Sequence, residues 1–99
     1  MKPNSFLEKQ YTKDANIVSR QIAGEYILVP IHQKAGEVES IYTLNNVATR
    51  IWESLDGEQS LIQIRDMIVA EFEVNPEEAS DDIIEFAQHL ESVGAINEV

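Results

Sequence analysis

Residues 44–57 read LNNVATRIWESLDG, and within this stretch the spacing of the apolar side chains changes from about two residues to nearly four. A spacing near four places apolar side chains on one face of an α-helix. Asn45 or Asn46 can cap the first free N–H groups, and Gly57 can end the helix. The stretch therefore predicts a first helix that packs an apolar stripe against a core. This stripe consists of Val47, Ala48, Ile51, Trp52 and Leu55.

Three short strands are predicted before this helix. Residues 17–22 alternate in polarity with a period of two, which is typical of a strand with one better-buried face. Gly24 can adopt the positive φ of a tight hairpin turn, and the apolar run at residues 26–29 predicts the returning, more central strand. Residues 39–44 predict the third strand, so the three strands form a meander.

Two further helices are predicted after the first. Ser60 and Gln63 have the spacing of a capping box at the start of the second helix. Asn75 can cap the third helix, with Pro76 at its first position, and Gly94 can end it. Three strands followed by three helices predict an α+β fold of the order βββααα. In such a fold the helices pack on one face of a three-stranded antiparallel sheet.

Length and composition favour one globular domain. The 99 residues are 43% hydrophobic and 25% charged, as in ordinary folded domains. Residues 1–15 are polar and without a pattern, so we expect a flexible N-terminal tail there and the folded domain over residues 16–99. The chain has no cysteine, which excludes disulfides and cysteine-ligated metals. Because the sequence contains neither a signal-peptide pattern nor a membrane span, we expect a cytoplasmic protein.

The charge of the chain is concentrated in its second half. The net charge is −11, and residues 51–99 hold thirteen acidic side chains against the single basic residue Arg65. Such a surface repels phosphate backbones and anionic lipid headgroups, because binding to nucleic acids depends on Lys and Arg. We therefore expect neither a nucleic-acid nor a membrane partner, and the acidic surface favours neutral or basic partners.

The sequence contains no recognisable catalytic motif. His32 and His89 lie far apart in the chain and neither accompanies a nucleophile motif. The pair Asp81 and Asp82 lacks the alternating oxygen ligands of a calcium loop, and the four glycines do not form a phosphate-binding loop. We therefore expect a protein that is not an enzyme and that uses no cofactor or metal.

Two other conspicuous side chains have structural interpretations. Trp52 lies on the apolar stripe of the first helix, so we interpret it as a core residue rather than a platform for stacking a ligand. Arg65 is surrounded in sequence by carboxylates, which favours a structural ion pair over an anion site.

A set of residues distributed along the chain resembles the PqqD family. The set comprises Val18 and Arg20, Gly24-Glu25-Tyr26-Ile27-Leu28, Leu44-Asn45, Ala48, Ile51-Trp52, Leu55-Asp56-Gly57, Ile64 and Phe72-Glu73-Val74. The resemblance covers about residues 16–97, and its specificity comes from the order and spacing of the pieces. The family is named for a protein of pyrroloquinoline quinone biosynthesis and is related to the recognition elements of peptide-modifying enzymes.

The resemblance implies a winged-helix-like fold and a non-catalytic role. Family members bind the leader segment of a ribosomally made precursor peptide as an added strand against the third strand. Side chains of the leader lie in a groove beside the third helix. The bound peptide is delivered to a radical S-adenosylmethionine enzyme or another modifying enzyme, so we expect the same partners here.

An edge strand suits this binding mode because it exposes unpaired N–H and C=O groups that an extended peptide can satisfy. We expect the third strand to be that edge and one flank of the third helix to line the groove. The expected peptide-binding residues are Glu39, Ser40, Ile41, Tyr42 and Thr43 on the strand and Asp82, Ile84, Glu85, Ala87, Gln88 and Glu91 on the helix.

The acidic helix flank predicts that a bound leader places a Lys or Arg against Asp82, Glu85 or Glu91. For Ile84 an alternative stays open, namely that it only widens the buried face of its helix.

Two other functions and two oligomeric states stay open as well. A generic protein-interaction domain is the first alternative, and a nucleic-acid-binding winged helix, which the charge disfavours, is the second. We expect a monomer, although exposed strand edges also permit a strand-exchanged dimer.

Overall fold

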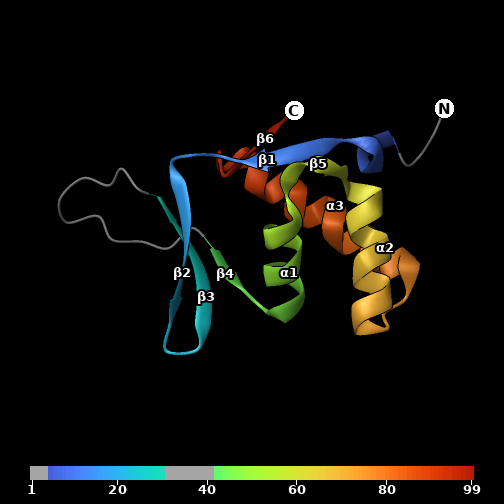
Figure 1. The fold of residues 1–99 in the computed structure, drawn as a ribbon, viewed down its shortest axis with the longest axis horizontal. Coiled ribbons are helices and arrows are strands. Elements are labelled where there is room, and N and C mark those ends of the chain that lie inside the picture. The colour runs from blue at the N-terminus through green and yellow to red at the C-terminus, as the bar shows by residue number, and fades with distance from the viewer. Residues whose placement is uncertain (1–4, 31–41) are drawn as a thin grey trace.

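The computed structural model describes residues 5–30 and 42–99 (Figure 1). Over these residues the chain forms two small antiparallel sheets, three α-helices and one short 3-10 helix. In Figure 1 one sheet stands beside the helices and the other lies across their ends. The prediction of an α+β fold with three helices and antiparallel strands is therefore confirmed.

The sheet beside the helices, called sheet B here, contains the predicted hairpin. It consists of β2 (Ile17–Ile22), β3 (Glu25–Pro30) and β4 (Tyr42–Leu44) in the order β2-β3-β4. Ala23 and Gly24 between β2 and β3 have φ values of 53° and 82°, as in a two-residue type I′ turn. The central position of the second predicted strand is confirmed. Residues 39–41 of the third predicted strand lie outside the described residues.

The three helices begin where the capping signals predict. They are α1 (Asn46–Ser54), α2 (Leu61–Phe72) and α3 (Pro76–Ser92). The Asn45 side chain accepts a hydrogen bond from the Ala48 N–H at 2.8 Å, and Ser60 and Gln63 form the complete capping box. The Asn75 side chain accepts from the two N–H groups that follow Pro76. These bonds satisfy donors that a helix start leaves unpaired.

A second sheet, called sheet A, departs from the predicted βββααα order. Its central strand β1 (Gln10–Lys13) pairs with β5 (Asp56–Ser60) on one side and with β6 (Ile96–Glu98) on the other. Strand β5 lies between α1 and α2, and β6 follows α3, so strands interrupt and follow the run of helices. Strand β5 reads DGEQS, in which no side chain is apolar, so local periodicity cannot reveal it.

The N-terminal segment also differs from the flexible tail expected over residues 1–15. Within it, η1 (Ser5–Glu8) is a 3-10 helix and β1 is the centre of sheet A. Leu7 and Tyr11 are 0% exposed, and η1 contacts both α2 and α3. The segment has few apolar residues, but these two enter the core, and both pairing partners of β1 lie more than forty residues away. The composition of the N-terminal segment alone therefore cannot predict that β1 pairs with strands so far away in the chain.

The core lies between the helices and both sheets. Trp52 is 2% exposed, which confirms its interpretation as a core residue. Leu28 and Leu44 of sheet B join the same cluster as the apolar faces of the helices. The Arg65 guanidinium lies 2.8 Å from the Asp66 carboxylate and also donates to Ser80, which confirms a structural ion pair. The helices and both sheets therefore share one hydrophobic core.

Candidate functional site

A cavity of about 330 Å³ opens between α1, α3 and the end of α2. Both apolar and polar residues line it, and the polar ones come from α3 and from the cap of α1. The apolar lining consists of Val47, Ala48, Ile51, Ile68, Val74, Ala79, Ile83 and Phe86, and the polar lining of Asn45, Glu78, Asp82 and Glu85. A volume at the lower end of the range for ligand pockets suits a few side chains rather than a large cofactor.

The acidic rim of this cavity follows from helical spacing on α3. Glu78, Asp82 and Glu85 are separated by four and three residues, so they lie one above the other on one strip of the helix. All three are exposed, whereas Ile83 and Phe86 beside them are buried. No Lys, Arg or His lines the cavity among the residues that the structure describes. The opening therefore combines an apolar interior with a negative border.

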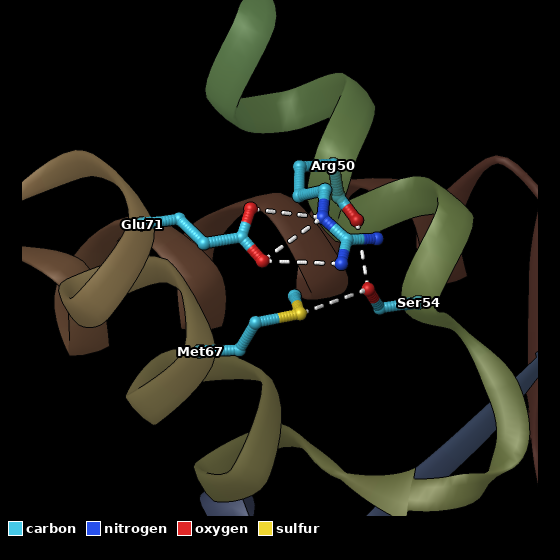
Figure 2. A network of polar contacts seen from close by, with 4 residues as sticks. All are labelled: Arg50, Ser54, Met67 and Glu71. Atoms are coloured by element: carbon cyan, nitrogen blue, oxygen red, sulfur yellow. Dashed lines mark hydrogen bonds and ion pairs between the residues drawn. The ribbon is translucent and has the colours of Figure 1, made fainter.

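A network of polar contacts links α1 to α2 (Figure 2). The Arg50 guanidinium contacts both carboxylate oxygens of Glu71, at 3.0 and 3.1 Å. These hydrogen bonds raise the pKa of Arg50 and lower the pKa of Glu71. The Ser54 hydroxyl donates to the Arg50 carbonyl at 2.9 Å and lies 3.7 Å from the sulfur of Met67. The basic residue of α1 is thus paired with α2 and does not offset the acidic rim.

Strand β4 leads directly into this cavity. It is the terminal strand of sheet B over the described residues, and Asn45, the residue that follows it, lines the cavity. A shallow, more open depression of about 510 Å³ is lined by Thr43 and Leu44 of β4, and it shares Asn45 and Ala48 with the cavity. Over the described residues, the terminal strand of sheet B and the cavity therefore adjoin at Asn45.

The structure separates the helix residues that the sequence analysis grouped into one flank. Asp82 and Glu85 line the cavity. Glu91 instead accepts a hydrogen bond from the Tyr11 hydroxyl at 3.3 Å, on the side of α3 that faces β1. Burial, followed by the charge of Glu91, raises the pKa of Tyr11 to about 12.

The remaining three helix residues do not line the cavity. Ala87 is 2% exposed within the core, Ile84 is half-buried against that core, and Gln88 is exposed. The contact of Ile84 matches the alternative that it widens the buried face of its helix.

The expected strand residues are only partly described. Tyr42 and Thr43 belong to β4, while Glu39, Ser40, Ile41 and also His32 lie outside the described residues. Within residues 5–30 and 42–99, no group of His, Cys, Asp and Glu side chains has an arrangement that could hold a metal ion.

Sequence reasoning missed part of the site. Val47, Ala48 and Ile51 were assigned to the core stripe, yet Val47 and Ala48 are only half-buried because the stripe extends past the core into the cavity. Glu78 was not among the predicted site residues. Its spacing from Asp82 and Glu85 was a signal that could have found the acidic strip.

Comparison with known proteins gives one match. The family model described as Coenzyme PQQ synthesis protein D (PqqD) matches residues 25–96. The matched stretch contains β3, β4 and all three helices, and hence every residue that lines the cavity. No curated protein and no solved structure matches the chain. Among the described helices, none combines the length and apolar character needed to cross a membrane.

Proposed function

This chain belongs to the PqqD family, and from that premise we propose that it binds the leader segment of a ribosomally made precursor peptide and delivers it to a modifying enzyme. The family consists of non-catalytic accessory proteins, and membership indicates a peptide-binding partner of biosynthetic enzymes. The leader pairs with the outer edge of β4 and places side chains in the cavity between α1 and α3.

One observation carries this proposal, namely that the terminal strand of a sheet runs into an apolar cavity. In the described part of the chain, β4 has β3 on one side and no strand on the other. An extended peptide can satisfy the N–H and C=O groups on that free side. Alternate residues of such a peptide point to the same face, so they can enter the adjoining hollow. Backbone pairing then supplies affinity and the cavity supplies selectivity.

The proposal includes the partner and the setting. The leader is handed to a radical S-adenosylmethionine enzyme or another modifying enzyme in the cytoplasm, and the protein acts as a monomer. The winged-helix-like topology that the resemblance implies belongs to the same proposal. The generic protein-interaction alternative shares the surface but requires no peptide.

An amide-shift titration by NMR tests the proposal. The probe is a synthetic copy of the leader segment of a precursor peptide identified among the neighbouring reading frames. We expect shifts at Thr43 and Leu44 on β4 and at Ala48 and Ile83 in the cavity, together with slower amide hydrogen exchange in β4. Shifts confined to sheet A, or none at saturating peptide, would contradict leader binding at this edge.

A further inference from the structure

We propose that the cavity selects an extended peptide carrying, on one face, a bulky apolar side chain and a Lys or Arg two residues away. The inference rests on the proposed function, which supplies the extended peptide, and it specifies the chemistry of that peptide. The apolar residues of the cavity receive one side chain, and the acidic strip receives the side chain two residues away. The two-residue period of an extended chain places both on the same face.

The interior of the cavity has room for the bulky side chain. Ala48 and Ile51 of α1 face Ile83 and Phe86 of α3 across a volume of about 330 Å³. An apolar cavity of roughly 150 Å³ is enough to hold a benzene ring. One Leu, Phe or similar side chain therefore fits with space to spare, and its burial removes apolar surface from water.

The acidic strip has the length to contact residues next to this anchor on the same face. Glu78 and Asp82 are four residues apart and Asp82 and Glu85 three apart, which on a helix gives rises of about 6 and 4.5 Å. Residues two apart in an extended chain are separated by about 6.6 Å. For a bound strand that runs along α3, a basic side chain two residues from the anchor lies level with one of the carboxylates, whereas an immediate neighbour of the anchor points to the opposite face.

The preference for a basic over an acidic side chain on the peptide follows from the charges around the opening of the cavity. Among the described residues, Glu78, Asp82 and Glu85 take part in no ion pair. The arginines of α1 and α2 are engaged elsewhere, Arg50 by Glu71 and Arg65 by Asp66. A Lys or Arg on the peptide gains Coulomb attraction that the protein itself does not supply, while an Asp or Glu is repelled.

Four synthetic peptides test the pattern. Each is a capped threonine-rich strand with one central leucine. The first carries lysines two residues from the leucine, the second carries lysines directly beside it, and the third has glutamates where the first has lysines. The fourth has serine in place of both the leucine and the lysines. Affinities are measured by amide-shift titration at low and at high salt.

We expect the first peptide to bind about three- to ten-fold more tightly than the second, from two exposed ion pairs. High salt reduces that advantage, because exposed pairs are screened. The triple variant Glu78→Gln, Asp82→Asn, Glu85→Gln should abolish the advantage. The control variant Glu58→Gln, Glu77→Gln, Asp81→Asn removes the same number of exposed carboxylates, but outside the cavity. It should therefore keep the advantage of the first peptide.

The outcomes separate this inference from the proposed function. Equal affinity for the first three peptides, each tighter than the fourth, overturns the charge pattern and leaves peptide binding at the cavity intact. An equal loss in both triple variants overturns it as well, since net charge alone would then explain the preference. If none of the four peptides shifts any amide of β4 or the cavity, the inference and the proposed function fail together.

Discussion

Filling the cavity from α1 should abolish most of the affinity for a leader peptide while leaving the fold intact. Ala48 is the position of choice because it is half-buried, lines the cavity and adjoins β4 through Asn45. In the variant Ala48→Phe, a ring that needs roughly 150 Å³ takes up about half of the 330 Å³ cavity. Because Ala48 also lines the depression beside β4, the ring stands where a peptide paired with β4 enters the cavity, and it blocks the anchor side chain of the peptide.

The size of the effect follows from what the anchor would have buried. Full burial of a Leu- or Phe-sized side chain contributes about 1.5–3 kcal/mol. Its loss weakens binding by roughly 10- to 150-fold. The stability of the free protein should change little, because Ala48 lies at the cavity rather than in the closed core and its N–H keeps the bond to Asn45.

Fluorescence anisotropy with a labelled synthetic leader measures this loss, and a thermal melt followed by circular dichroism measures stability. The matched control is Ala70→Phe, which adds the same ring to an exposed position of α2 that does not line the cavity. Wild-type affinity in Ala48→Phe, with an unchanged melt, would refute the assignment of the cavity to the peptide. An equal loss in Ala70→Phe would do the same.

Three further outcomes concern the fold. Deletion of residues 1–13 removes two fully buried side chains, Leu7 and Tyr11, and should cost about 3–6 kcal/mol; a cooperative melt at the full-length temperature would contradict this. The raised pKa of Tyr11 means that the folded state holds the phenol proton more tightly. The protonated Tyr11 therefore contributes its full stabilisation to the folded state below pH 10, and this stabilisation is lost as the pH rises to about 12. The variant Tyr11→Phe should lack this step in pH-dependent denaturation. Asn75→Ala should lower the free energy of unfolding by about 1 kcal/mol in urea titration, and no change would show that the α3 cap is dispensable.

The sequence predicted the strand and the helix that carry the candidate site, but it did not predict most of the residues that line the cavity. Asp82 and Glu85 were predicted and line the cavity, whereas Glu91 was assigned to the same flank and contacts Tyr11 instead. The helical period places these residues around an axis, yet it does not say which neighbour covers which side. That choice depends on β1, a strand that the polar N-terminal composition concealed.

The sequence by itself determined the elements whose interactions are local. The β2–β3 turn at Ala23 and Gly24, the cap at Asn45 and the capping box at Ser60 each depend on bonds between residues at most a few positions apart. Only the tertiary structure decided sheet A and the cavity. Sheet A pairs Tyr11 with Glu98, and the cavity is bounded by residues of α1, of α3 and of the end of α2. Such contacts join distant parts of the chain, so no window of neighbouring residues contains the pattern that produces them.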